Sequence, residues 1–289
     1  MISRLFHFQS KSITFSANIL IISSLISAVL GLLRNRLLAG TFGAGHETDV
    51  YLAAFRIPDL VYAIFILGGI SVAFLPLFSE YFEKDKKEAW IFANNLLNIL
   101  FAGLAIFSAI LVFVAPFIVS LTTPGFSGEE RTLTVSLMKI MFLSPIFFGI
   151  ASVLSGVVQY FDRFLAYALA PILYNLGIIA GIVFLTPVFG IWGAGVGVAF
   201  GAFLYFLIQL PSAIRSGFRW KPILNIQHPS VAKVFRLAIP RLPGAIGYQI
   251  NLIIMTALAS LFSSGSITVF GFANDIQSFP INLFGVPFA

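Results

Sequence analysis

Long apolar segments dominate the chain and alternate with short polar connectors. A helix needs about 20 mostly apolar residues to cross the hydrocarbon core of a bilayer. Seven segments reach that length and an eighth begins before the sequence stops: 15–38, 50–79, 89–121, 132–160, 164–186, 191–214, 231–262 and 266 onward. Because long uncharged runs carry the apolar residues, the pattern predicts membrane helices and not a barrel of alternating strands.

Two of these segments are long and contain prolines. Pro58 and Pro76 lie in the second segment, and Pro240 and Pro243 lie in the seventh. Proline lacks a backbone donor and its ring clashes with the preceding helical turn. A membrane protein tolerates this where neighbouring groups or water satisfy the freed carbonyls. We therefore expect a kink or a break in both segments.

The composition supports a membrane protein and argues against several classes of chemistry. Apolar residues make up 59% and charged residues 10% of the 289 residues, and the mean hydropathy is +1.00. Ordinary soluble domains carry about 25% charged residues. The chain has no cysteine and three scattered histidines, so a protein-built metal site is not expected. No nucleophile–base pair or phosphate-binding loop is present, and we predict neither enzymatic activity nor a cofactor.

Basic residues are distributed unequally between the connectors. Ten lie on the side of the N-terminus: Arg4, Lys11, Lys84, Lys86, Lys87, Arg163, Arg215, Arg219, Lys221 and Lys233. Only Arg131 lies in a connector on the other side. The positive-inside rule therefore predicts a multi-pass membrane protein with its N-terminus in the cytoplasm. The net charge of +6 reflects the basic residues of these connectors and does not predict a nucleic-acid partner.

The segments predict an all-α fold, a polytopic transmembrane helix bundle. We assign residues 1–214 to an N-terminal lobe of six helices and residues 215–230 to a cytoplasmic loop. Residues 231–289 are expected to supply the first two helices of a second lobe. The sequence stops at Gly285–Ala289, inside an apolar run, and we expect it to be a fragment of a longer transporter.

Eight charged residues fall inside the predicted spans: Arg34, Arg36, Arg56, Lys139, Arg236, Arg241, Asp59 and Asp275. Such charges are costly in hydrocarbon and normally face the bundle interior or a wet cavity. At about 1.5 Å per helical residue, Arg56, Lys139 and Asp59 lie about 9–13 Å below the outer surface, which predicts a cationic pocket there. Arg36 and Arg236 lie near helix ends, where their side chains can reach the interface.

Several of these charges have more than one interpretation. Arg56 and Asp59 either face the pocket or satisfy each other along one helix. Arg241 and Asp275 each lie about 15 Å from opposite ends of the seventh and eighth segments. That depth predicts a contact between them, either a structural ion pair or a charge switch. Asp49 is either an N-cap of the second helix or a ligand. Asparagines expected to bond neighbouring helices are Asn94, Asn95, Asn98 and Asn175.

A series of motifs, in order along the chain, resembles one known family. The motifs are Ser27–Gly45, Thr48-Asp49, Ala54–Leu60, Ser71–Pro76, Thr123–Phe126, Tyr160–Phe164, Ala170-Pro171 with Asn175, Gln209–Pro211, Ser263–Ser266 and Phe279-Pro280. They resemble the N-terminal part of the MurJ/MviN lipid II flippases, in the multidrug/oligosaccharidyl-lipid/polysaccharide exporter superfamily. The likeness covers nearly the whole chain, and the combined motif of the first two helices is the most specific part.

The resemblance implies a lipid transporter of the bacterial cytoplasmic membrane. Members of that family carry lipid II, an undecaprenyl-pyrophosphate saccharide of cell-wall synthesis, to the outer leaflet by alternating access through a cationic cavity. Arg34, Asp49 and Arg56 match charged positions of the family motif. The resemblance therefore implies substrate binding by Arg34, Arg56 and Asp49, and we add Arg241. Gating or structural ion pairing is expected among Arg241, Asp275 and Asp59.

The sequence departs from the family pattern in the eighth segment, where Asn274-Asp275 replaces the usual Asp-Arg pair. Ala28, Tyr62 and Ala63 also stand where arginines are common. Arg241 is our candidate to supply the missing positive charge. The alternatives are an exporter of another lipid-linked polysaccharide, a cation-coupled drug exporter and a membrane scaffold that does not transport. The expected partners are an anionic lipid-linked saccharide, membrane lipids and an unidentified coupling ion.

Overall fold

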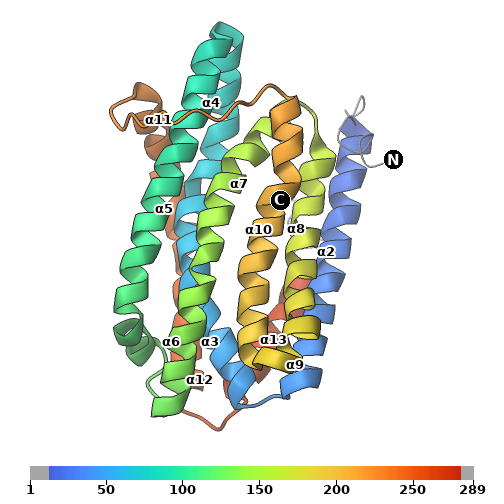
Figure 1. Cartoon of the computed structure of the whole chain (residues 1–289), viewed down its shortest axis with the longest axis vertical. Coiled ribbons are helices and arrows are strands. Elements are labelled where there is room, and N and C mark those ends of the chain that lie inside the picture. The colour runs from blue at the N-terminus through green and yellow to red at the C-terminus, as the bar shows by residue number, and fades with distance from the viewer. Residues whose placement is uncertain (1–12, 281–289) are drawn as a thin grey trace.

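Helices account for nearly all of residues 13–280, the part of the chain that the computed structural model describes. The first group runs through α2 (Ile13–Phe42), α3 (His46–Tyr62), the π-helix η1 (Ala63–Ile70), α4 (Ser71–Lys84), α5 (Lys86–Thr122), α6 (Gly128–Met141), α7 (Leu143–Tyr160), α8 (Phe164–Ala180), η2 (Gly181–Leu185), α9 (Thr186–Phe189) and α10 (Ile191–Arg215). The second group is α11 (Pro229–Ala238), η3 (Ile239–Arg241), α12 (Leu242–Ala259) and α13 (Ser266–Pro280). Figure 1 shows the long helices side by side in one bundle.

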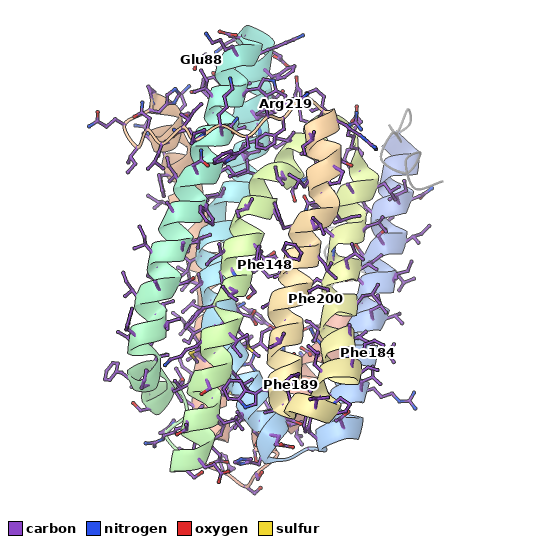
Figure 2. All side chains as sticks on the ribbon, viewed as in Figure 1. Glu88, Phe148, Phe184, Phe189, Phe200 and Arg219 are labelled. Atoms are coloured by element: carbon purple, nitrogen blue, oxygen red, sulfur yellow. The ribbon has the colours of Figure 1, made fainter. Side chains whose placement is uncertain are left out.

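The architecture confirms the predicted all-α membrane bundle. Six helical segments between residues 18 and 259 are long and apolar enough to cross a membrane. The second predicted span is present as the succession α3, η1 and α4, and the eighth is α13. Large apolar side chains face outward, such as Phe184 and Phe189, which are 73% and 60% exposed (Figure 2). This outer surface suits contact with lipid.

Both proline-containing segments are broken, as expected. In the second segment Pro58 lies in α3 and Pro76 lies in α4, and the backbone between these helices becomes π-helical. In the seventh segment Pro240 lies in the short 3₁₀ turn η3, and Pro243 opens α12. A proline inside a helix removes one hydrogen bond and forces its neighbours apart. These breaks change which faces of the two segments meet.

Glycines allow the tightest helix contact in the first group, between α10 and the continuous helix of α8 and η2. A Cβ atom on Gly181 would lie 2.5 Å from the Cα atom of Gly197. A Cβ atom on Gly177 would collide with Gly201. Small residues let the backbones of membrane helices approach and gain van der Waals contact. This contact fixes α8, which contributes one wall of the cavity described below.

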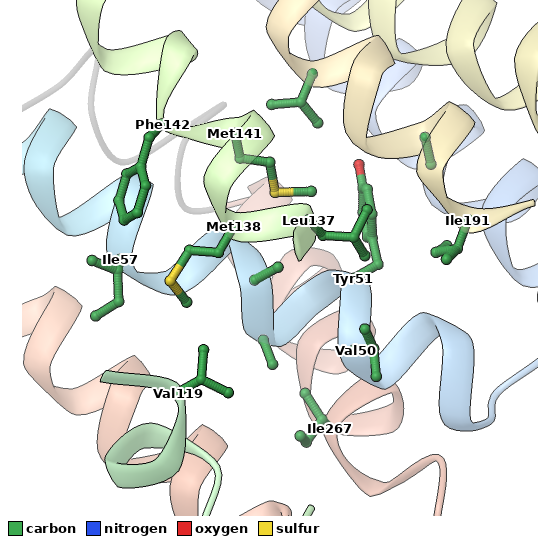
Figure 3. Packing of buried hydrophobic residues seen from close by; sticks show 14 of the residues in the cluster. Val50, Tyr51, Ile57, Val119, Leu137, Met138, Met141, Phe142, Ile191 and Ile267 are labelled. Atoms are coloured by element: carbon green, nitrogen blue, oxygen red, sulfur yellow. The ribbon is translucent and has the colours of Figure 1, made fainter. Parts of the chain in front are cut away.

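The largest buried cluster joins the two groups of helices. Val50, Tyr51 and Ile57 of α3 pack with Met138 of α6, and Ile267 of α13 belongs to the same cluster (Figure 3). Helix α12 packs on η1 and α3, and α13 packs on α3 and α2. The helices after residue 228 therefore lie against α2, α3 and η1, and the polar site lies at this junction.

The asparagines have two different roles. Asn175 of α8 donates from Nδ2 to the hydroxyl of Ser27 on α2, at 3.1 Å, and so bonds a neighbouring helix as expected. The expectation was wrong for Asn94, Asn95 and Asn98 of α5. They bind the backbone of the connector between α10 and α11. A connector that crosses the helix presents backbone N–H and C=O groups that need partners. An amide side chain can accept from the N–H and donate to the C=O.

Candidate functional site

A polar cavity of about 230 Å³ lies where α2, α3, α8 and α13 meet. Its lining residues are Arg34, Tyr51, Leu52, Phe55, Arg56, Asp59, Tyr174, Gly271, Asn274 and Asp275. Two arginines and two aspartates therefore face one space. Arg56 and Asp59 of the predicted pocket line this space, and Arg34 joins them there. Lys139 does not line this cavity and is exposed on α6, so its predicted place in the pocket was wrong.

Arg56 links two helices at this cavity. Its residue is 9% exposed, and its Nε atom donates to the Thr256 hydroxyl of α12 at 2.8 Å. Within residues 13–280 Arg56 forms no ion pair with Asp59. The mutual pairing of Arg56 and Asp59 is therefore absent in this conformation. A threonine within an apolar helix carries little signal in the sequence, and Thr256 was not predicted as a site residue.

Arg34 reaches the second group of helices through Asn35. The Nε and Nη2 atoms of Arg34 donate to Oδ1 of Asn35 at 3.1 and 3.0 Å. Nδ2 of Asn35 donates to Oδ2 of Asp275 at 2.7 Å. Nη2 of Arg34 lies 3.9 Å from the same Asp275 oxygen. All three residues line a second cavity of about 180 Å³, and Arg34 and Asp275 line both cavities.

Asp275 therefore faces Arg34 and not Arg241 in this structure. Arg241 lies in η3, is exposed, and has no ion pair within the described part of the chain. At roughly 1.5 Å per helical residue, Asp275 lies about 14 Å from the turn that joins α12 to α13. Arg241 lies about 27 Å from the same turn. Segment 231–262 is longer than the bilayer core. Equal distances of Arg241 and Asp275 from opposite ends of their segments therefore do not place the two residues at equal depth in the membrane. A contact in another conformation stays a prediction.

Asp49 binds the start of a distant helix. Its side chain is buried, and Oδ2 accepts a hydrogen bond from the amide of Gly265 at 2.7 Å. Oδ1 accepts from the amide of Thr268 at 2.7 Å and from the Thr268 hydroxyl at 2.6 Å. A carboxylate at a helix N-terminus satisfies amides that have no partner in the helix and favours the helix dipole. Asp49 therefore caps α13, and the expectation that it caps its own helix was wrong.

The turn before α13 comes very close to α3. Gly265 has φ +93, a conformation that residues with a side chain rarely adopt. A Cβ atom there would lie 2.5 Å from the carbonyl oxygen of Ala44. Both facts explain why glycine stands in the turn that Asp49 holds.

The two ends of the junction are held by contacts of different strength. At the end where α13 begins, the Asp49 contacts are buried. At the opposite end, Glu80 of α4 pairs with Lys233 of α11 at 3.8 Å, and both side chains are more than 40% exposed. Exposed ion pairs contribute little to stability, about 0–1 kcal/mol. The ion pair between Glu80 and Lys233 therefore contributes less than the buried hydrogen bonds of Asp49.

Tyr51 supplies a polar group that sequence reasoning missed. Tyr51 lines the cavity, and its hydroxyl is buried with no hydrogen-bond partner among the described residues. A buried polar group without a partner costs about 1–3 kcal/mol. The cavity can thus offer a hydroxyl and two guanidinium groups to an anion. Within residues 13–280 no three acidic or histidine side chains are grouped so that they could hold a metal ion.

Comparison with known proteins connects this geometry to one family. The family model for the lipid II flippase MurJ matches residues 38–289. Lipid II flippase MurJ of Burkholderia cenocepacia is 30% identical over 272 residues, which cover 91% of this chain and 53% of that protein. The probable lipid II flippase MurJ of Vibrio cholerae is 29% identical over 294 residues, covering 97% of this chain and 56% of that protein. The chain spans about half the length of these curated relatives.

Solved structures give the same result at the level of the fold. The structure described as lipid II flippase MurJ in an inward closed conformation has a TM-score of 0.78 and 29% identity, over 95% of this chain and 56% of that one. An inward-facing multidrug resistance transporter of the MATE family has a TM-score of 0.66 and 16% identity, over 90% of this chain and 59% of that one. The second likeness shows a shared fold alone.

Proposed function

The chain belongs to the MurJ lipid II flippase family, and from this membership and the cavity we propose that it forms the first half of a lipid II flippase. In this proposal the full-length protein moves an undecaprenyl-pyrophosphate saccharide across the cytoplasmic membrane by alternating access. The N-terminus lies in the cytoplasm, residues 1–214 form the first lobe, 215–230 form a cytoplasmic loop, and 231–289 begin the second lobe. The family is one of transporters, and the drug-exporter and scaffold alternatives receive no support from the curated relatives.

One observation carries the proposal: Arg34 and Arg56 line the same cavity at the junction of the two groups of helices. A guanidinium group binds phosphate oxygens through two parallel hydrogen bonds. Two such groups with the Tyr51 hydroxyl suit a diphosphate. A site between lobes that move relative to each other also meets the geometric requirement of alternating access.

We propose that Asp275 acts as an internal counter-ion for Arg34. The negative charge beside Arg34 balances the guanidinium in the absence of substrate, and a phosphate group takes its place during binding. Arg241, which is exposed in this conformation, is the proposed additional phosphate contact in a state where α12 has moved. Asp59 balances Arg56 across the cavity without a direct ion pair.

Complementation tests the proposed function. The full-length protein is expected to restore growth of a bacterium depleted of its own lipid II flippase, and to restore exposure of lipid II at the outer surface of spheroplasts. Membrane insertion is measured separately by fractionation. An inserted protein that restores neither growth nor lipid II exposure would refute the proposal.

Asp275→Asn is expected to strengthen binding of an anionic lipid about tenfold. The amide keeps the shape of the carboxylate and the hydrogen bond with Asn35 but removes the charge that competes for Arg34. The measurement is the Kd of the full-length protein for farnesyl diphosphate in detergent. Because the ion pair is partly exposed, we expect the free energy of unfolding to change by less than about 1 kcal/mol.

The double variant Arg34→Gln/Asp275→Asn is the control for this effect. The gain in affinity should vanish in it, since Asp275 is proposed to act through Arg34. An equal gain in the presence of Arg34→Gln, or no gain in Asp275→Asn alone, would show that Asp275 does not compete with the ligand.

A further inference from the structure

The connector between α10 and α11 alternates apolar and polar residues along its sequence. From Phe218 to Gln227 the even positions are apolar: Phe218, Trp220, Pro222, Leu224 and Ile226. Of the odd positions, all but Ile223 are polar or basic: Arg219, Lys221, Asn225 and Gln227. Residues 218–227, which we call the strap, therefore place basic residues directly beside aromatic ones, and Phe218 is buried while Trp220 is exposed.

The strap is attached to α5 by a ladder of asparagine side chains. Asn94 donates to the Arg219 carbonyl at 3.0 Å and accepts from the Lys221 amide at 2.6 Å. Asn95 pairs in the same two-way manner with the backbone of Asn225, at 2.8 and 2.6 Å. These contacts hold the strap at a fixed height on α5.

The third member of the ladder fixes a tryptophan. Nδ2 of Asn98 donates to the carbonyl oxygens of Lys221 and Ile223 at 2.7 and 2.9 Å. Its Oδ1 accepts a hydrogen bond from Nε1 of Trp220 at 3.0 Å. The indole ring is thus oriented while 63% of Trp220 stays exposed. A structural loop does not require an exposed, oriented indole, and its position suggests contact with a ligand.

An apolar groove of about 310 Å³ lies directly below the strap. Its lining residues come from α5, α7, α10 and the strap: Leu97, Asn98, Phe101, Ile150, Leu154, Phe206, Leu210, Phe218 and Trp220. Phe101 at its edge is 49% exposed, so the groove opens toward the surroundings of the bundle. The volume is at the lower end of the range for ligand pockets, roughly 300–1,000 Å³.

We propose that this groove binds one acyl chain of an anionic phospholipid, whose headgroup lies on Arg219 and Lys221. Both basic residues are exposed and flank Trp220 in the strap. Tryptophan is enriched at the boundary between hydrocarbon and water, and basic residues at this depth attract anionic headgroups. Figure 2 shows Arg219 at the end of the bundle where Glu88 also lies, the end that the positive-inside rule assigns to the cytoplasm.

Lipid fits the groove better than a protein partner does. The groove walls belong to α5, α7 and α10, whereas α12 and α13 pack chiefly on η1, α3 and α2. Figure 1 shows α7 and α10 in front of α12 and α13. None of the described residues after 228 lines the groove, so the second group of helices leaves it open. Apart from Asn98, the residues that line the groove are apolar or aromatic, and the basic residues Arg219 and Lys221 belong to the strap alone. This inference does not depend on the proposed transport.

Quenching of Trp220 fluorescence tests the proposal. The chain has three tryptophans, and Trp90→Phe/Trp192→Phe leaves Trp220 as the reporter. The variant is placed in phosphatidylcholine nanodiscs that contain brominated phosphatidylglycerol, or brominated phosphatidylcholine at the same mole fraction. We expect quenching by the anionic lipid to be about fivefold more efficient, because Arg219 and Lys221 attract its headgroup. Equal quenching by the two lipids would overturn the proposal.

Matched variants separate a built site from general surface charge. Arg219→Gln/Lys221→Gln should remove the preference for phosphatidylglycerol, and Leu210→Phe, which fills the groove, should reduce quenching by both lipids. Lys84→Gln/Lys87→Gln removes the same charge at the same end of the bundle and should leave the preference intact. Loss of the preference in this control, or its persistence in Arg219→Gln/Lys221→Gln, would contradict the proposed site.

Discussion

Arg34→Ala and Arg56→Ala are each expected to abolish growth in the complementation assay, while the protein remains inserted in the membrane. Each substitution removes a guanidinium group from the cavity. A hydrogen bond to a charged group contributes about 1.5–3 kcal/mol, which corresponds to a loss of tenfold or more in substrate affinity. Arg→Lys should restore part of the activity, because an ammonium group keeps the charge but cannot form the planar pair of hydrogen bonds.

Two controls make this result specific. Arg36 lies two residues from Arg34 on the same helix but is exposed and does not line the cavity. Arg36→Ala should therefore complement normally. Thr256→Val removes the partner of the Arg56 Nε atom and retains the charge, so it separates the helix contact from the charge effect. Full growth with both arginine-to-alanine variants would assign these arginines to packing.

Asp49→Asn is expected to release the start of α13 and to destabilise the protein by about 2–4 kcal/mol. The carboxylate of Asp49 offers two acceptor oxygens to three donors, whereas an asparagine offers one oxygen and one NH₂ group. At least one buried donor therefore loses its partner. Loss of a helix cap by itself costs about 0.5–2 kcal/mol. The measurements are thermal unfolding in detergent and thiol labelling of Ile267→Cys. Ile267 is fully buried at the first turn of α13, and the chain has no other cysteine.

Glu47→Gln is the matched control for this prediction. Glu47 lies in the same first turn of α3 as Asp49, and no hydrogen bond or ion pair of its side chain occurs within the described residues. We expect Glu47→Gln to unfold and to label like the parent protein. If Asp49→Asn also behaved like the parent, the three hydrogen bonds would not hold the two groups of helices together. In that case the proposed role of Asp49 in substrate binding would regain weight over its role as a cap.

The family motif identified Asp49 as a functional residue but did not identify the groups that its carboxylate binds. Local sequence suggests that an acid in the first turn of a helix interacts with that helix. The structure shows that its partners are Gly265 and Thr268, more than 200 positions away. No local pattern contains such a contact, because it depends on how two helices approach each other. Tyr51 and Thr256 were missed for the same reason, since their side chains look like ordinary members of an apolar helix.

The sequence by itself determined the class of fold, the order of the spans and the positions of the breaks. The length of an apolar segment relative to the bilayer, and the effect of proline on a helix, depend only on residues within that segment. The family motif and the need of an intramembrane charge for a polar environment also identified Arg34 and Arg56 as cavity residues, although the second argument wrongly selected Lys139 as well.

Only the tertiary structure decided which charges meet. The partner of Asp275 depends on the rotation of α13, on the break at η3 and on the tilt of a segment longer than the membrane. A shift of one residue turns a helix by about 100°, so counting residues along a helix cannot determine such a pairing. The same limit applies to the strap, whose contacts with Asn94, Asn95 and Asn98 arise where the connector crosses α5. Depth in the membrane follows from the sequence, whereas the direction of a side chain follows from packing.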